Sequence, residues 1–301
     1  ETNFYFYVLS LLGLYKLFIL FKFKRHNILL ALAVLNLFPP SVVLRIIFKP
    51  EVMIATLFIW TIYFTKVYIK KSTTFNLIML ASTLSLISSM KISSTVIVFF
   101  ALTIIFIKDI YKFPKKTAFI ILTFFLFFII NLENYSANGL FLHQHIAPDG
   151  YKNTADLGFV INLDINHLIQ APVRNEHANS FISILLLDTF DDYFRLFWSN
   201  DESSFNSSRV NIYSPYMRQY LAIFLSSIFY LVVISSTFTK NKLKKFISLP
   251  LIGICFMLLV SLFIQFDPTT GDMMKNYYYG FLLTISFVSL FLSVKSYNFK
   301  I

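Results

Sequence analysis

Charged residues are scarce in this sequence. Asp, Glu, Lys and Arg make up 14% of its 301 residues, whereas a soluble domain carries about 25%, so the chain cannot cover a water-facing surface with polar groups. Glycine is also rare, with seven residues, while 57% of the chain is hydrophobic and 37 residues are Phe. This composition excludes a soluble globular enzyme, a disordered protein and a collagen-like fibre, and it predicts a protein that crosses a membrane several times.

Cysteine is nearly absent as well, since Cys255 is the single one in the chain. One thiol inside an apolar run excludes both an intramolecular disulfide framework and a Cys-rich zinc site. His143 and His145 could ligate a metal as a pair on an extended strand, but no third ligand is spaced to complete the site. The sequence also lacks a Gly-rich phosphate loop and the HExxH and GxSxG motifs.

Apolar runs long enough to cross a membrane occur nine times. A hydrocarbon core of about 30 Å needs roughly 20 helical residues. The runs are too apolar on all sides for amphipathic surface helices, and they do not alternate as barrel strands do. We therefore expect an all-α integral membrane protein in which residues 1–301 form a single polytopic domain. Its expected transmembrane helices are approximately 4–21, 27–45, 52–69, 75–90, 93–108, 117–132, 216–238, 246–266 and 277–294.

Lys and Arg are unevenly distributed among the connections between these runs. The connections after the first, third, fifth and seventh runs, with the end after the ninth, hold 16 of the 26 cations and one acid, Asp109. The other side holds 14 of the 15 acids. The positive-inside rule assigns the lysine-rich side to the cytoplasm, so we expect a cytoplasmic C-terminus and one outer loop over 132–215 with short interfacial helices. The net charge of +11 is then an orientation signal, and nucleic acid is excluded as a partner.

The start of the chain has an unusual position in this topology. With nine helices and a cytoplasmic C-terminus, Glu1 faces outside, and the first run follows within a few residues. The chain begins without Met, and the first run holds Lys16 and no small-residue cleavage site, unlike a signal peptide. We expect at least one further span and one outer loop upstream of Glu1.

The second run is interrupted by Pro39 and Pro40. A residue that precedes proline avoids the helical region of backbone conformation. Two interpretations therefore stay open for this run. Residues 41–48 form a separate short helix at the outer interface, or the run is one continuous, kinked helix.

Charged side chains gather at the outer ends of the expected helices, although charges near a membrane are costly unless they face a cavity or find partners. Cations there could hold the phosphate of a lipid-linked donor, and carboxylates could hold sugar hydroxyls or activate an acceptor hydroxyl. For any single Lys or Arg, snorkelling to the interface is the alternative explanation. The outer-end residues are Arg45, Lys49, Glu51, Lys91, Asp188, Asp191, Asp192, Arg195, Arg209, Arg218, Asp267, Asp272 and Lys275.

The outer segment 180–198 is the most distinctive stretch of the sequence. As a helix it would present Asp188, Asp191, Asp192 and Arg195 on one face, at spacings of three and four residues. One interpretation is a carboxylate cluster that binds a divalent cation or sugar hydroxyls. The other is an interfacial helix whose charged face is solvated.

The order of these features resembles the bacterial membrane glycosyltransferases of the GT-C superfamily. The branch concerned is related to the dolichyl-phosphate-mannose protein mannosyltransferases and the aminoarabinose lipid A transferase. Four outer motifs carry the resemblance and together cover nearly the whole chain. They are Phe38-Pro39 with Lys49-Pro50-Glu51, Ser88-Ser89-Met90-Lys91-Ile92-Ser93, Asp188-Thr189-Phe190-Asp191-Asp192-Tyr193 with Trp198, and Gly271-Asp272-Met273-Met274-Lys275 with Tyr277 or Tyr278.

The resemblance implies a transferase, with or without a divalent metal, that moves a sugar from a polyprenyl-phosphate donor to a glycan, lipid or protein acceptor at the outer face. It implies donor-phosphate contacts from Lys91 and Lys275. The family keeps an acidic residue in its first outer loop, which has no counterpart in this chain, so the main catalytic acid is expected upstream of Glu1. The carboxylates that could contact the sugar or act in catalysis are Asp188, Asp192 and Asp272, and the further substrate-binding candidates are Lys49, Glu51, Asp191, Arg209 and Tyr278.

Two other function classes are alternatives to glycosyl transfer. A polysaccharide polymerase or ligase also uses polyprenyl carriers, but its large outer loop is rich in Arg, whereas the loop here is acidic. A lipid-linked sugar flippase or transporter would have ionisable residues near the membrane midplane and inverted repeats. Apart from Lys16, the centres of the apolar runs are nearly free of charge.

Overall fold

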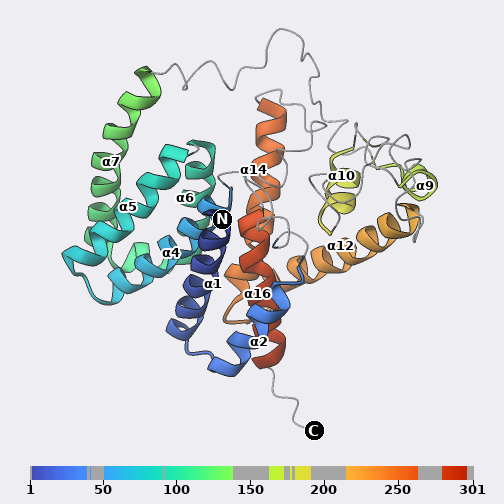
Figure 1. Ribbon diagram of the computed structural model, residues 1–301, viewed down its shortest axis with the longest axis horizontal. Helices are drawn as coiled ribbons and strands as arrows, with labels where there is room; N and C mark the ends of the chain where they lie inside the picture. Colours follow the sequence, from blue (N-terminus) through green and yellow to red (C-terminus); the bar gives the residue numbers. More distant parts are fainter. Residues whose placement is uncertain are drawn as a thin grey trace.

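The computed structural model describes residues 2–38, 41, 51–90, 92–137, 163–172, 177, 180–190, 215–263 and 280–296. Within these ranges every regular element is a helix and no strand occurs, which confirms the predicted all-α class. Each of the nine apolar runs contains a helix (Figure 1). These helices are α1 (Thr2–Leu20), α2 (Arg25–Leu35), α4 (Glu51–Lys70), α5 (Thr74–Met90), α6 (Ile92–Lys112), α7 (Pro114–Ala137), α12 (Pro215–Phe238), α14 (Leu249–Phe263) and α16 (Gly280–Ser296).

Three helices of the described chain are long and apolar enough to cross a membrane: Val52–Lys70 in α4, Ser94–Lys112 in α6 and Gln219–Phe238 in α12. The apolar parts of α1, α2, α5 and α16 are shorter. Three such helices indicate a membrane protein. The described chain also contains three short helices that lie between or beside the apolar runs: α9 (Ile165–Gln170), α10 (Phe181–Asp188) and α13 (Lys244–Ile247).

The second run does not form one helix over 27–45, because α2 ends at Leu35. The backbone N–H groups of Asn36, Leu37 and Phe38 each bond to the carbonyl three residues earlier, at 3.0–3.2 Å, which is the pattern of a tight 3₁₀ turn. The Pro39-Pro40 pair explains this end, since proline disfavours helical backbone at the residue before it. A helix of 11 residues is about 16 Å long, so α2 is too short to cross a bilayer. Residues 42–50, where a separate short helix was the alternative, lie outside the described residues.

Helices α1 and α4 run side by side in the same direction. Thr56 Oγ1 lies 2.8 Å from the Phe6 carbonyl oxygen, and Trp60 Nε1 donates to the Leu9 carbonyl at 3.2 Å. Residue numbers therefore rise together along both helices. The chain returns through a short turn after Lys70, so that α5 packs antiparallel to α4.

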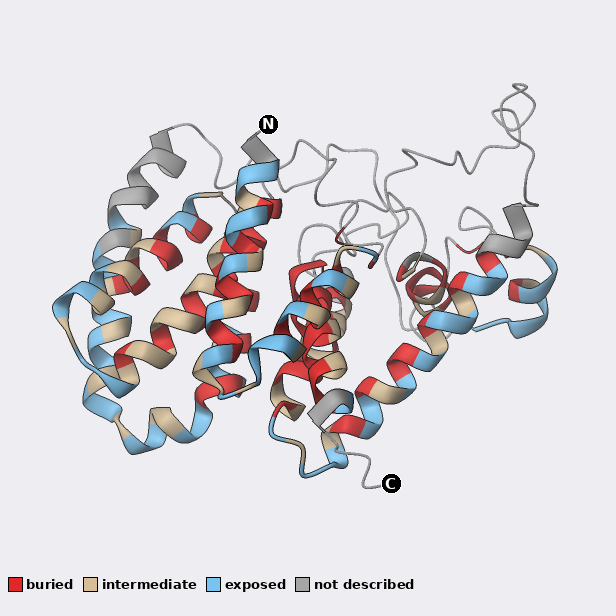
Figure 2. Ribbon diagram, turned by 60° about the horizontal axis from the view of Figure 1, so that its bottom comes forward, coloured by how far each residue is buried: buried red, intermediate tan, exposed pale blue. Residues whose placement is uncertain are grey.

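Helix α16 occupies the centre of the bundle and packs against α2, α4, α13 and α14. It is buried on nearly all sides (Figure 2). Its Phe281 ring lies 4.8 Å from the Phe58 ring of α4, and its Phe287 ring stacks on Phe38 with centroids 4.2 Å apart. The central position of α16 fixes the relative positions of the helices that surround it.

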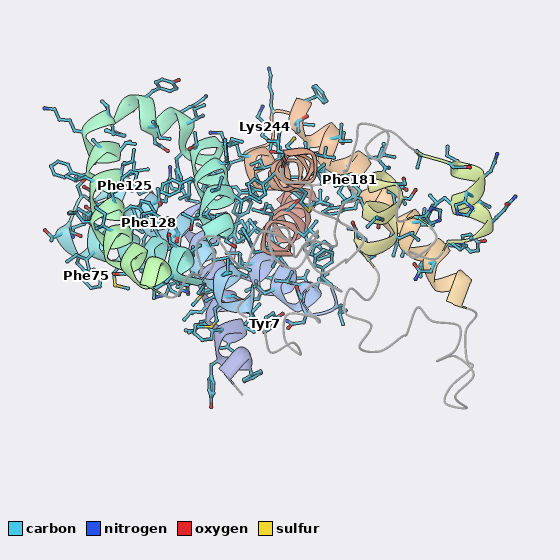
Figure 3. All side chains as sticks on the ribbon, turned by 90° about the horizontal axis from the view of Figure 1, so that it is seen from above. Tyr7, Phe75, Phe125, Phe128, Phe181 and Lys244 are labelled. Atoms are coloured by element: carbon cyan, nitrogen blue, oxygen red, sulfur yellow. The ribbon has the colours of Figure 1, made fainter. Side chains whose placement is uncertain are left out.

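The outer faces of α7 and α12 consist of large apolar side chains. On α7 the exposed residues include Phe119, Leu122 and Phe125, whereas Phe128 is half-buried (Figure 3). On α12 they include Leu221, Phe224 and Leu231. Exposed apolar faces of this extent are unfavourable in water, and they are the surfaces that lipid tails would cover.

Candidate functional site

Lysine-rich connections meet at one end of the bundle, called here the lysine end. The ends of α1, α4 and α6 lie there beside the start of α7 and the connection from α12 to α13. Connections that are far apart in the sequence are thus neighbours in the fold. The contacts are Lys66 Nζ with Asp109 Oδ2 at 3.4 Å, Lys116 Nζ with the Ile69 carbonyl at 2.8 Å, Lys245 Nζ with the Ile105 carbonyl at 2.9 Å, and Lys242 Nζ with the Phe21 carbonyl.

The helix ends that border three of the predicted site segments lie at the opposite end of the bundle. Helix α4 begins at Glu51, the turn between α5 and α6 contains position 91, and α16 begins at Gly280, directly after the segment 271–279. The Thr56 contact with Phe6 lies at the starts of α1 and α4. Phe281, the second residue of α16, packs its ring on Phe58, which follows Thr56 by two residues in α4. The start of α16 therefore lies at the same end.

The α5–α6 turn reaches this end through hydroxyl contacts. Thr61 Oγ1 of α4 and Thr83 Oγ1 of α5 are 2.9 Å apart and buried near the middle of both helices. One to two turns further along α5, Thr95 Oγ1 of α6 donates to Ser88 Oγ at 3.0 Å, also buried. Ser88 and Thr95 stand three and four residues from position 91 in the sequence. Their contacts were not part of the sequence-based site, and the only signal for them is the density of Ser and Thr on both sides of position 91.

Helix α10 packs against the middle of α12. Thr189, which follows α10, places Oγ1 2.6 Å from the Tyr230 hydroxyl in a buried contact. The adjacent Phe190 ring lies 5.5 Å from the Phe38 ring, which in turn stacks on Phe287 of α16. The end of α10 is therefore held next to the end of α2 and the central helix.

The helix predicted over 180–198 is shorter than expected. Ser180 caps its start by accepting a hydrogen bond from the Ser183 backbone N–H at 3.2 Å, but the helix ends at Asp188. Thr189 and Phe190 are not helical, so the helix is not continuous over 180–198, and Asp191, Asp192 and Arg195 of the predicted charged face lie outside the described residues. On the apolar side of the segment, Leu185 is buried.

The backbones of Glu51 and Asp188 are described: Glu51 begins α4 and Asp188 ends α10. The other predicted site residues lie outside the described residues, so the structure positions the helix ends that border them and not their side chains. They are Lys49, Lys91, Asp191, Asp192, Arg209, Asp272, Lys275 and Tyr278.

Two histidines meet beside the short helix α9. Asp164 caps α9 by accepting from the His167 backbone N–H at 3.0 Å, and the His167 ring lies 4.8 Å from the ring of buried His177. His177 Nε2 is 2.8 Å from the Ala171 carbonyl, so this nitrogen carries the proton. Among the described residues no group of three or more His, Cys, Asp or Glu side chains could hold a metal ion. The His143 and His145 pair lies outside the described residues.

Comparison with protein-family models, with curated proteins and with solved structures found no match to this chain. The functional assignment therefore depends on the chemistry of its own residues. That chemistry separates the two ends of the bundle. One end is rich in lysine. At the other end several helices begin or end, and these helix ends border the predicted site residues in the sequence.

Proposed function

We propose that this chain is a membrane glycosyltransferase that moves a sugar from a polyprenyl-phosphate donor to a glycan, lipid or protein acceptor at the outer face of the membrane. The observation that carries the proposal is the convergence of helix ends opposite the lysine end. The starts of α4 and α16 and the α5–α6 turn meet there. In the sequence, Glu51 begins α4, Lys91 lies between α5 and α6, and Lys275 precedes the start of α16 by five residues.

The proposed topology follows from the directions of the helices. The nine apolar runs alternate between the two ends, with the lysine end in the cytoplasm and the C-terminus on that side. Its support is that α1 and α4 run in parallel, whereas α5 returns antiparallel. Figure 1 likewise draws α1 and α16 descending and α7 and α14 ascending. Residues 132–215 then form the outer loop that brings α9 and α10 to the active face.

The proposed reaction uses cations and carboxylates in different roles. A hydroxyl oxygen of the acceptor attacks the anomeric carbon of the donor sugar, while the bond from that carbon to the phosphate oxygen breaks and polyprenyl phosphate leaves. Lys91 and Lys275 stabilise the negative charge on the leaving phosphate. A carboxylate takes the acceptor proton, and Asp188, Asp192 and Asp272 are the candidates in this chain.

Transfer and transport can be separated in one experiment. The protein, together with any native residues upstream of Glu1, is reconstituted in vesicles with a polyprenyl-phosphate sugar that carries radiolabel on the sugar, and label is followed both into acceptor and across the bilayer. We expect label to enter the acceptor, and the variant Lys115→Ala at the lysine end to behave like the wild type. Movement of labelled lipid across the bilayer with no label in the acceptor would replace the proposal by a flippase.

A further inference from the structure

Four lysines from three separate helices gather at the lysine end and form what we call the lysine cluster. Lys66 comes from α4, Lys108 from α6, and Lys244 and Lys245 from α13. Asp109 is the carboxylate among them, and it pairs with Lys66 at 3.4 Å. The cluster with its one acid therefore holds an excess of three positive charges. The proposed sugar-transfer site does not use these residues, because it lies at the other end of the bundle.

Lys245 is a member of the cluster that the fold holds in place through a backbone contact with α6. Its side chain is half-buried, and Nζ donates one hydrogen bond to the Ile105 carbonyl at 2.9 Å. An ammonium group has three N–H donors, so two further donors of Lys245 are available to a partner. The hydrogen bond to the Ile105 carbonyl fixes the position of the Lys245 ammonium group, whereas a lysine that extends into water has no fixed position.

The charges of the cluster act on one another. Burial lowers the pKa of Lys245, the positive charge of Lys108 lowers it further, and Lys66 and Lys244 add to this effect, whereas Asp109 raises it. Protonated Lys245 therefore has more positive than negative charge around it. A bound anion would relieve this repulsion, which is the electrostatic condition for an anion site.

The surface next to the cluster is apolar and belongs to the same helix as Lys108. Phe100, Ile104 and Ile107 of α6 are all exposed, at spacings of four and three residues. Residues at this spacing lie on one face of a helix, and the face leads directly to exposed Lys108. An anion with an attached hydrocarbon chain would fit both parts of this surface, whereas a soluble anion would use only the lysines.

We propose that the lysine cluster binds the phosphate of an anionic phospholipid headgroup, with the acyl chains of the lipid along the exposed face of α6. Phosphate accepts several hydrogen bonds from ammonium groups, and basic sites between helices at the membrane surface bind anionic headgroups. The site needs only the membrane location of the chain and its lysine end. It is therefore independent of whether the chain transfers sugar.

The test compares lipids and variants on the purified full chain in detergent micelles. Phosphatidylglycerol, phosphatidylcholine and inorganic phosphate are added separately, and bound lipid is counted by native mass spectrometry. We expect retained phosphatidylglycerol, little phosphatidylcholine and no displacement of lipid by inorganic phosphate. Lys108→Gln and Lys245→Gln should each weaken phosphatidylglycerol binding about fivefold, since one lysine near an anionic surface contributes about that factor.

Lys115→Gln is the matched control. Lys115 is an exposed lysine in the first turn of α7 at the lysine end, and its replacement by Gln removes one positive charge, as the two test substitutions do. It should bind phosphatidylglycerol like the wild type. Equal losses in all three variants would show a diffuse charge effect and overturn the site. Displacement of the lipid by inorganic phosphate would reassign the cluster to a soluble anion. If Lys245→Gln fails to fold, the comparison of Lys108→Gln with Lys115→Gln decides the question, since both positions are exposed.

Discussion

Thr189 Oγ1 and the Tyr230 hydroxyl lie 2.6 Å apart in a buried contact, and they join the end of α10 to the middle of α12. Thr189 Oγ1 is also 2.6 Å from the Leu185 carbonyl. One hydroxyl thus connects the end of a short helix to its own last turn and to a long apolar helix. The contact fixes where α10 ends, directly before the positions that carry Asp191 and Asp192 in the sequence.

Removal of this hydroxyl should loosen α10. We expect Thr189→Val to lower the free energy of unfolding by about 1–3 kcal/mol, because the Tyr230 hydroxyl loses a buried partner. Thermal unfolding in detergent measures the effect. Thr123→Val in α7 is the control, since Thr123 is half-buried and its exposed hydrogen bond to the Phe119 carbonyl lies within its own helix; it should change stability little. Equal effects in both variants would contradict the special role of Thr189.

Gly13 should be intolerant of a larger side chain. A methyl group there would lie 2.9 Å from Ile59 Cγ2 and 3.2 Å from Trp60 Nε1, where α1 crosses α4. We expect Gly13→Leu to separate the two helices and to cost about 1–3 kcal/mol by overpacking. Ala33→Leu on the exposed side of α2 adds similar volume without a neighbour, so its unfolding midpoint should stay near that of the wild type.

Lys91 should affect the use of the donor rather than the fold. The sequence has no acid within four residues of it, and an ammonium group near the hydrocarbon edge favours a lipid-borne anion as partner. We expect Lys91→Ala to weaken the use of a polyprenyl-phosphate sugar strongly and to leave expression normal. Measurement of donor KM and kcat tests this. Unchanged values would assign Lys91 to snorkelling at the interface.

The orientation can be tested by cysteine labelling. Cys255 is exposed on α14, so it is first replaced in a Cys255→Ser background. We expect Asn153→Cys in the outer loop to react with an impermeant thiol reagent in intact cells, and Asn241→Cys at the lysine end to react only after the membrane is opened. Equal labelling of the two positions would overturn the proposed topology.

Apolar runs predict the helices of this chain well, because a helix satisfies its backbone hydrogen bonds without water. The run expected over 52–69 forms α4, Glu51–Lys70. The helix boundaries were predicted less accurately where the chain breaks a helix within one apolar run. Helix α2 stops at Leu35 ahead of two prolines, and the residues at the start of the eighth run belong to the separate turn α13.

The candidate site was less predictable than the helices. The hydroxyl contacts of Thr61 with Thr83 depend on the register between two helices, which apolar patterning does not specify. Short helices were expected within 132–215, but the position of α9 was not predicted, because six residues are too few to show an apolar periodicity; Asp164 at its start is the local signal for it. Lys22 takes the left-handed backbone conformation after α1 (φ 65°), although glycine is the residue usually found there.

The contact between the end of α1 and the start of α13 has a consequence for the synthesis of the protein. The Phe21 carbonyl accepts from Lys242, and the Phe21 ring lies 5.2 Å from Phe246, so the first helix completes its packing against residues made more than 200 positions later. At roughly 5–20 residues per second, a ribosome needs on the order of 10–45 s to supply them. During that interval lipid, the insertion machinery or a transient neighbour must cover the apolar surface of the first helix that α13 covers in the finished protein. Ribosome-nascent chains that stop before Phe246 should therefore be cleaved by protease in the α1–α2 turn more readily than the finished protein.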